Sequence, residues 1–563
     1  MLPHPLSFSA LFSTLPSFRR SGQFLLIDLC GFELLPAMAP VYRSTGQLVW
    51  FLVCLQWSWI PAESGKLLAV PVDGSHWLSM KTIVEELHGR GHQIVAVYPE
   101  HSLMIKTSRH YTSKTYFIPF SQDDVDQVYR NLVQMAFYNG TFYERVRSSL
   151  EHISDFRQFF LSQCEYLLFN TELMEELAEE KFDALLTDPF SPCGAIVGEY
   201  LTLPIVNLLR GIPCGLEYSA TQCPRPLSFV PRMFTGNNDR MTFLQRAANT
   251  MATFLEQLLC YFLYSPFEEL AIRFLKKDVT LVQLLSRNTI WLLRYDFIME
   301  YPRPLMPNMV LVGGINCKER KPLPQDLEEF MNSSGEHGAV IFSLGSMVAD
   351  MPISTANMIA EAIGQLPQKV LWRHSGERPS TLAPNTKLMD WLPQNDLLAH
   401  PKTRAFLTHG GTHGIYEAIC SAVPMVMLPL FGDQAENMHH MIHHGAGVGL
   451  SLKDINSQEL VNALVDVIND TRYKEAMMRM SSLHKDRPVE PLALSVYWVE
   501  FVMKHRGAKH LQTAAHHLNW VQYHCLDVIG ILLAVALLLV YLMFKCCSIC
   551  LHRVRGHRKN KLD

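Results

Sequence analysis

Residues 391–450 read WLPQNDLLAHPKTRAFLTHGGTHGIYEAICSAVPMVMLPLFGDQAENMHHMIHHGAGVGL, and this stretch decides the fold. Its pattern predicts a strand, a glycine-rich turn with two histidines, a helix and a second strand, with Asp433 and Gln434 after it. Such a turn holds a phosphate group at the helix N-terminus, where backbone N–H groups are unpaired. The stretch therefore predicts an α/β domain that binds a nucleotide diphosphate with a sugar beside it.

The same alternation of strand and helix runs through both halves of the chain. Short apolar runs bounded by turn residues predict the strands, and apolar side chains at helical spacing predict the helices between them. This order indicates two doubly wound, Rossmann-like α/β domains that face a cleft, with sites at the C-terminal ends of the strands. The predicted strands are 66–72, 93–98, 182–187, 203–209, 339–343, 369–372, 405–408 and 424–428.

Composition narrows the class of protein. The chain has 563 residues, of which 48% are apolar and 18% charged, which suits two folded domains with appended segments. A net charge of -4 argues against a surface that binds nucleic acid. The 13 cysteines are scattered without CxxC pairs at zinc spacing, so the sequence predicts no structural zinc site.

A hydrophobic segment lies near the C-terminus. Residues 528–544 carry no charge and are followed by Lys545 and a basic tail, which predicts one membrane-spanning helix at 526–544 with a cytosolic tail at 545–563. The final KNKLD resembles the dilysine retrieval signal of the endoplasmic reticulum, although a basic tail also shows this spacing by chance. Cys546, Cys547 and Cys550 are either palmitoylated or simply unmodified juxtamembrane cysteines.

The N-terminal region predicts entry into the secretory pathway. An apolar run at 48–60 precedes small residues, so 38–64 resembles a cleavable signal peptide, and 1–37 is an extension before it. A working signal places the body in the lumen. Three sequons then become candidate N-glycosylation sites, at Asn139, Asn332 and Asn469.

Two residues suit proton transfer. His76 lies in the loop PVDGSHW after the first strand, and Asp188 lies in the turn TDPF after a later strand. A neutral histidine held by a carboxylate is a suitable base near pH 7, and both positions lie at strand C-terminal ends. Each residue alone has a simpler explanation, a structural histidine and an Asp-Pro turn.

The glycine-rich stretch resembles the signature of the UDP-glycosyltransferases, and the details are similar to the UDP-glucuronosyltransferases of family 1, the phenol- and bilirubin-conjugating type. The resemblance runs from about residue 65 to the tail. It implies a GT-B glycosyltransferase fold. It also implies an acceptor-binding domain at 65–305, a UDP-sugar-binding domain at 306–505 and a lumenal juxtamembrane segment at 506–525.

The resemblance implies a role for each site residue. His76 would be the base and Asp188 its partner in an inverting displacement; Trp391 would stack on uracil, and Glu417 would bind the ribose hydroxyls. Asp433 and Gln434 would bind the sugar hydroxyls, and Arg246 either binds the glucuronate carboxylate or is an exposed helical arginine. The implied UDP-binding set is Ser343, Gly345, Ser346, Trp391, Gln394, His409, Gly411, His413, Gly414 and Glu417.

The implied reaction transfers glucuronic acid from UDP-glucuronate to a hydroxyl of small lipophilic acceptors such as phenols, steroids, bilirubin-like compounds or xenobiotics. Two alternatives stay open: the same fold with UDP-glucose or UDP-xylose, or a catalytically silent partner that regulates active relatives. The implied setting is the endoplasmic reticulum membrane, as a single-pass type I protein in homo- or hetero-oligomers, with no nucleic-acid partner.

No cofactor and no metal are expected beyond the co-substrate. The DxD motif at Asp124 and Asp126 follows a polar stretch typical of a helix start, where acids favour the helix dipole. Four histidines, His439, His440, His443 and His444, could suggest a metal site, but a solvated helix face is the prediction.

Overall fold

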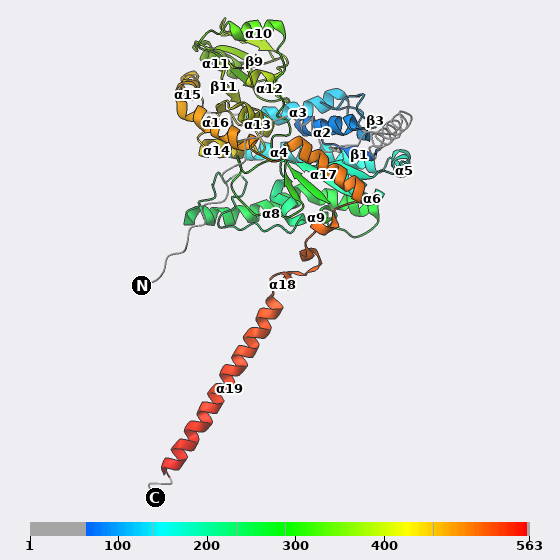
Figure 1. Cartoon of the computed structure of the whole chain (residues 1–563), viewed down its shortest axis with the longest axis vertical. Helices are drawn as coiled ribbons and strands as arrows, with labels where there is room; N and C mark the ends of the chain where they lie inside the picture. Colours follow the sequence, from blue (N-terminus) through cyan, green and yellow to red (C-terminus); the bar gives the residue numbers. More distant parts are fainter. Residues whose placement is uncertain are drawn as a thin grey trace, which may run out of the picture. The chain divides into compact units, whose positions relative to one another are not determined.

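The computed structural model describes residues 64–559, except for 139, 234, 288, 349 and 454 (Figure 1). The predicted extension at 1–37 and all of the predicted signal peptide except its last residue lie outside the described residues. Two parallel sheets, each flanked by helices, make up the body, which confirms the α/β fold of two doubly wound halves.

The first sheet has seven parallel strands in the order β3-β2-β1-β4-β5-β6-β7. Its central strands are continuous apolar runs, as expected for strands covered by helices on both faces. The strands are β1 (Lys66–Val70), β2 (Gln93–Pro99), β3 (Thr112–Tyr116), β4 (Ala184–Thr187), β5 (Ile205–Leu209), β6 (Ile290–Leu293) and β7 (Met309–Leu311).

The second sheet has six parallel strands in the order β10-β9-β8-β11-β12-β13. In both sheets the order reverses beside the first strand, between β1 and β4 and between β8 and β11. Ligands of open α/β sheets bind at such switch points, outside the C-terminal ends of the strands. The strands are β8 (Ala339–Ser343), β9 (Lys369–Arg373), β10 (Thr386–Met389), β11 (Thr403–Thr408), β12 (Met425–Met427) and β13 (Gly447–Gly449).

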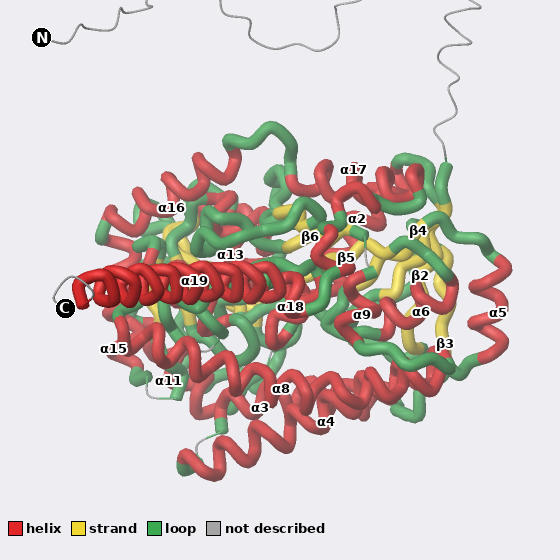
Figure 2. Tube along the Cα trace, turned by 90° about the horizontal axis from the view of Figure 1, so that it is seen from below, coloured by secondary structure: helices red, strands yellow, loops and turns green. Residues whose placement is uncertain are grey.

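The helices cover the sheets and fill the space around them. Figure 2 shows α3, α4 and α8 lying together, and α4 contacts both α3 and α8. Those of the N-terminal half are α2 (Ser75–Gly89), α3 (Gln122–Phe137), α4 (Phe142–Leu168), α5 (Thr171–Glu179), α6 (Cys193–Leu201), η1 (Pro213–Gly215), α7 (Leu216–Ala220), α8 (Phe243–Leu275) and α9 (Leu281–Ser286).

The helices of the C-terminal half include the one that opens at the glycine-rich turn, α13. They are α10 (Gln325–Asn332), α11 (Ile353–Gly364), α12 (Gln394–Leu398), α13 (Thr412–Ser421), α14 (Gln434–His443), α15 (Ser457–Asn469), α16 (Thr471–Lys485), α17 (Pro491–His505), η2 (Lys509–Leu511), η3 (Ala514–His517), α18 (Trp520–Tyr523) and α19 (Leu526–Lys559).

Helix α17 follows the second sheet in the chain but packs on the first. Its buried Val496, Val499 and Val502 share a core with Leu67 of β1 and Leu186 of β4. This burial places apolar side chains of the last body helix in the core of the first sheet.

Five strands have no counterpart in the sequence prediction. β3 reads TSKTY and is polar, and β7 and β13 have three residues each, too few to show a period. β7 also lies inside the proline-rich stretch 300–315, and its pairing with β6 adds this segment to the first sheet.

Two disulfides join distant segments. Cys164 of α4 bonds Cys193 at the start of α6, and Cys317 after β7 bonds Cys420 in α13. The first bond fixes the segment that follows Asp188, and the second fixes the helix that follows the glycine-rich turn.

The C-terminal helix is longer than predicted. α19 continues to Lys559, past the predicted end of the membrane span at 544. Leu526–Arg553 is the one candidate membrane span among the described residues, with a mean hydropathy of 2.7 in its most apolar part. By length and composition it fits a single-pass membrane protein.

Candidate functional site

His76 and Asp188 meet at the switch point of the first sheet. His76 lies in the first turn of α2, directly after β1, and Asp188 follows β4. The imidazole Nδ1 of His76 lies 2.6 Å from Oδ2 of Asp188, and the backbone N–H of Phe190 donates to Oδ1 at 3.0 Å. The side chain of Asp188 is 2% exposed and that of His76 is 27% exposed, so the pair has a buried partner and an accessible one.

Electrostatics keeps this carboxyl ionised. Burial alone would raise the pKa of Asp188, but His76 and the nearby Arg294 hold it below its ordinary value. An ionised Asp188 accepts the Nδ1 proton of His76, which leaves Nε2 as the nitrogen that can take a proton from a substrate.

The glycine-rich turn opens α13. Gly411 caps this helix with extended backbone, and Gly414 sits in its first turn with little room for a side chain. His409 and His413 are half-buried, and desolvation lowers the pKa of His409 to about 4 and that of His413 to about 3. Both rings are therefore neutral near pH 7 and act as hydrogen-bond donors rather than as cations.

His413 is oriented by its neighbours. Nδ2 of Asn316 lies 3.0 Å from Nδ1 of His413 and donates to it, which places the ring proton on Nε2. That nitrogen lies 3.7 Å from the carboxylate of Glu417, one turn further along α13. Burial raises the pKa of Glu417 to about 7, and Gln394 donates to its Oε2 at 2.5 Å. Gln394, His413 and Glu417 therefore lie together.

The exit of β8 lies beside this helix. The hydroxyl of Ser343 accepts from the N–H of Gly345, which has a positive φ of 87° and packs against His409. The guanidinium of Arg373 donates to the carbonyls of Gly345 and Ser346. It also lies over the ring of Trp391, 5.2 Å from the centroid, and the indole is 56% exposed. Arg373 thus ties the loop to an aromatic surface open to a ligand.

Asp433 and Gln434 come together at the N-terminus of α14. The carboxylate Oδ2 of Asp433 accepts from the hydroxyl of Thr412 at 2.9 Å and from Nδ2 of Asn437 at 2.8 Å. Gln434 uses its carbonyl oxygen to accept the N–H groups of residues 430 and 431, so its amide nitrogen is the group that can donate to a hydroxyl.

Arg210 is a residue of this site that the sequence prediction missed. It follows β5 and reaches the second half of the chain, where Nε donates to Thr412 at 3.1 Å and lies 3.3 Å from Asp433. Its Nη2 donates to Asn437 at 2.8 Å and pairs with buried Glu300. The carboxylates of Glu300 and Asp433 raise the pKa of Arg210 despite its burial, so its guanidinium stays positively charged. Only the fold shows this role, because nothing near Arg210 in sequence matches a motif.

Arg294 was also missed. It follows β6, is 8% exposed, and donates from Nη1 to Ser79 of α2 at 2.8 Å. Burial lowers the pKa of its guanidinium, while Asp188 and Asp433 raise it. Arg294 therefore places a buried positive charge near both carboxylates.

Arg246 lies elsewhere. It is exposed on α8, and its Nη1 donates to the carbonyl of Met241 at 2.9 Å. Among the described residues, no hydrogen bond or ion pair joins it to Asp433 or Gln434.

Two further motifs have structural roles. Asp124 caps α3 by accepting from the N–H and hydroxyl of Ser121, which confirms the predicted helix start. The prediction of a solvated face for the histidine run is wrong for His440. That side chain is 2% exposed, 4.5 Å from the ring of Tyr301 and 3.5 Å from Glu300, because α14 packs against the segment after β6.

Among the sequons, Asn332 and Asn469 are exposed at the ends of α10 and α15, as an acceptor of a glycan must be. Asn139 lies outside the described residues.

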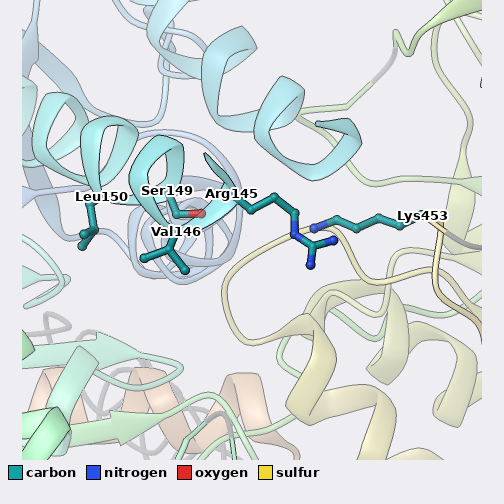
Figure 3. Close-up of a pocket in the computed structure, with 5 residues that line it drawn as sticks. All are labelled: Arg145, Val146, Ser149, Leu150 and Lys453. Carbon is teal, nitrogen blue, oxygen red and sulfur yellow. The ribbon is translucent and has the colours of Figure 1, made fainter. Parts of the chain in front are cut away.

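One cavity borders the His76–Asp188 pair, with Asp188, Thr187 and the Cys164–Cys193 disulfide in its wall. Figure 3 shows another, of about 440 Å³, where Arg145 of α4 and Lys453 of the loop after β13 extend toward each other. Val146 and Leu150 form its apolar side.

This arrangement can do group-transfer chemistry. The His76–Asp188 pair lies at the switch point of the first sheet. At the switch point of the second sheet lies the glycine-rich turn with the neutral histidines, together with the buried carboxylate of Glu417 and the exposed indole of Trp391. The contacts of Arg210 with both Thr412 and Asp433 join the two halves.

Comparison with known proteins gives the same picture. The chain is 54% identical over 489 residues to human UDP-glucuronosyltransferase 1A1, covering 87% of this chain and 92% of the relative. It is 53% identical over 514 residues to human UDP-glucuronosyltransferase 1A6, covering 91% and 96%.

Solved GT-B glycosyltransferases share the fold. The glycotransferase of kitacinnamycin matches with a TM-score of 0.54 at 16% identity, covering 79% of this chain and 99% of that one. The calicheamicin glycosyltransferase CalG4 matches with a TM-score of 0.51 at 16% identity, covering 79% and 98%. The predicted GT-B fold is thus confirmed.

The model of the family described as "UDP-glucoronosyl and UDP-glucosyl transferase" matches residues 65–561. The chain therefore belongs to this family and is a glycosyltransferase that uses a UDP-sugar donor and an acceptor substrate.

Proposed function

We propose that the chain transfers glucuronic acid from UDP-glucuronate to a hydroxyl of small lipophilic acceptors, by direct displacement with inversion at the anomeric carbon. The observation that carries this proposal is the 2.6 Å contact between His76 and Asp188 at the switch point of the first sheet. The identity to two human UDP-glucuronosyltransferases supports glucuronate as the sugar.

In this mechanism Nε2 of His76 takes the proton of the acceptor hydroxyl as its oxygen attacks the anomeric carbon. Asp188 holds the ring through Nδ1 and stabilises the imidazolium that forms. The bond from the sugar to the diphosphate breaks on the opposite face, and UDP leaves as an anion. The N-terminus of α13 and the neutral rings of His409 and His413 stabilise its charge with N–H donors.

The donor is held by the second half of the chain. Trp391 stacks on uracil, Gln394 contacts the uridine, and Glu417 binds the ribose diol. Asp433 and Gln434 bind sugar hydroxyls, one as acceptor and the other as donor. The remaining members of the proposed UDP site are Ser343, Gly345, Ser346, Gly411 and Gly414.

Glucuronate also carries a carboxylate, and Arg246 remains the proposed partner. Because its side chain is exposed on α8 and donates to the carbonyl of Met241, this assignment needs its own variant, Arg246→Gln.

The proposed cellular location rests on two segments, the predicted signal peptide at 38–64 and the candidate membrane span in α19. We place α19 across the endoplasmic reticulum membrane as a single-pass type I anchor, with the body in the lumen and the tail in the cytosol. Domains at 65–305 and 306–505 would bind acceptor and donor. Glycans at Asn139, Asn332 and Asn469, oligomers with relatives, and a reaction without metal or cofactor belong to the same proposal.

A donor panel tests the proposal. Microsomes that express the full chain are treated with detergent and given UDP-glucuronate, UDP-glucose or UDP-xylose with a mixture of phenols, and conjugates are identified by mass. Glucuronides from UDP-glucuronate are expected. Glucosides or xylosides alone would show that the donor is UDP-glucose or UDP-xylose. If folded, glycosylated protein formed no conjugate with any donor, the result would favour the silent regulatory partner.

A further inference from the structure

Among the described residues, helix α8 presents an apolar face that is mostly uncovered, although the guanidinium of Arg157 lies 4.4 Å from the ring centroid of Phe262 at one end. Between Phe243 and Phe262 its large exposed apolar side chains fall within about a third of the helix circumference. Each of them is between 36% and 77% exposed. They are Phe243, Leu244, Met251, Phe254, Leu255, Leu258, Tyr261 and Phe262, called here the α8 stripe.

The opposite side of the helix is anchored in the body. Asn249 is fully buried and donates to the carbonyls of Leu227 and Val230, and Tyr264 and Phe267 are buried in the core of the first sheet. α8 is therefore held in place, and its exposed stripe is not the result of a helix that has turned away from its core.

The charged residues of this part of α8 lie off the stripe. From Phe243 to Phe262 the charged residues are Arg246 and Glu256, and both lie off it. Glu256 is 11% exposed and pairs with Arg225. Soluble surfaces of monomers seldom leave so many large apolar side chains together, and a patch of this kind marks an interface with a protein or a membrane.

The path of the chain from α9 to α19 favours a membrane, rather than another protein, as the partner of the α8 stripe. Gln512 donates to the carbonyl of Ser286 in α9, and α9 contacts α8. The candidate span begins only 14 positions later, at Leu526. Even fully extended this linker reaches about 50 Å, and η3 and α18 shorten it. The linker therefore keeps the surface at α9 within about 50 Å of the start of the span.

The linker itself carries side chains typical of a membrane surface. Trp520 is 69% exposed and Tyr523 is 39% exposed, directly before the span. Tryptophan and tyrosine are enriched at this depth, because their rings suit the boundary between headgroups and acyl chains.

We propose that the α8 stripe docks the body on the bilayer spanned by α19, with the helix in the plane of the interface and its apolar side chains among the acyl chains. A stripe of 20 residues is about 30 Å long, and such helices bury their apolar face about 5–10 Å deep. The proposal rests on the anchoring of α19 and is independent of the sugar that is transferred.

The test is photolabelling of the full chain in lipid nanodiscs that contain phospholipids with a diazirine in the acyl chain. Labelled peptides are identified by mass. Labels are expected in α19 and in residues 243–262, and not in Met478 and Leu483 of α16, which are 55% and 62% exposed and serve as the apolar control surface.

Two variants sharpen the result. Leu244→Glu/Leu255→Glu/Leu258→Glu changes only exposed side chains of the stripe and is expected to lose the α8 label while α19 keeps its label. Met478→Glu/Leu483→Glu is expected to leave the α8 label unchanged. Release of UDP from UDP-glucuronate, measured on the same samples, reports the proposed function separately from docking.

Label in α19 with none in residues 243–262 would overturn the proposal. So would chemical cross-links from α8 of one copy to α8 of another in place of lipid label, because a second copy would then be the occupant. An α8 label that survives in the glutamate variant would mean that the stripe is not the docking surface.

Discussion

Nδ1 of His76 lies 2.6 Å from Oδ2 of Asp188, although 112 positions separate the two residues in the chain. The strand order places β1 beside β4, and each residue follows one of these strands. The contact therefore follows from topology, and it gives the histidine one fixed nitrogen and one free nitrogen.

The first prediction concerns this pair. His76→Ala is expected to lower the rate of transfer by at least about 10²–10⁴-fold, the usual contribution of a general base. UDP affinity should stay within about twofold, a change worth only ~0.4 kcal/mol, because the proposed diphosphate site is at the N-terminus of α13. Rates and UDP affinity are measured on the same protein.

Asp188→Asn is the matched variant. It keeps the shape but removes the charge that stabilises the imidazolium, so the rate should fall while UDP binding persists. Full activity in either variant would remove the pair from the mechanism.

The second prediction concerns pH. Burial raises the pKa of Glu417 to about 7, with Lys318, Asp396 and His413 as its charged or titratable neighbours. Ribose hydroxyls donate to an ionised carboxylate more strongly than to a neutral acid, so donor affinity should rise as pH increases through 7. Since the ionised fraction falls about tenfold for each pH unit below the pKa, titration calorimetry with UDP-glucuronate at pH 6 and 8 should show the change. Glu417→Gln should remove it, and an unchanged slope in that variant would assign the titration to another group.

The third prediction concerns Arg210. Arg210→Lys keeps the charge but loses the fork that holds Thr412 and Asp433 together, so Asp433 is positioned less well. The KM for the donor should rise about tenfold, equivalent to ~1.4 kcal/mol, with little change in the KM for the acceptor. Arg303→Lys is the control, because Arg303 pairs with Glu300 at 3.5 Å and, among the described residues, forms no hydrogen bond or ion pair with Asp433. Equal effects of both variants on donor and acceptor would indicate general destabilisation instead.

The fourth prediction concerns the disulfide between Cys317 and Cys420. Replacing both by Ser should lower the free energy of unfolding by about 2–4 kcal/mol, since the bond closes a long loop of the unfolded chain. Cys223→Ser, which changes a buried free thiol, controls for the substitution itself. Urea unfolding of the detergent-solubilised chain measures the stability of both variants. If the double variant were as stable as the wild type, the disulfide would not contribute to stability.

The sequence predicted the central strands and the glycine turn well, because each is an apolar run or a turn with its own local signal. Short or polar strands such as β3 and β7 were missed, since their pairing depends on neighbours far away in the chain. Arg210 and His440 were misjudged for the same reason: their partners lie on other elements, and local sequence carries no record of them.

The measurement that tests the central claim most directly is the anomeric configuration of the product. Purified full-length chain is given UDP-glucuronate, in which the sugar is α-linked, and a simple phenol, and the conjugate is analysed by NMR. A β-glucuronide that forms with wild-type protein and is lost with His76→Ala is the predicted result. An α-glucuronide, or a β-glucuronide formed equally well by His76→Ala, would contradict direct displacement with His76 as base.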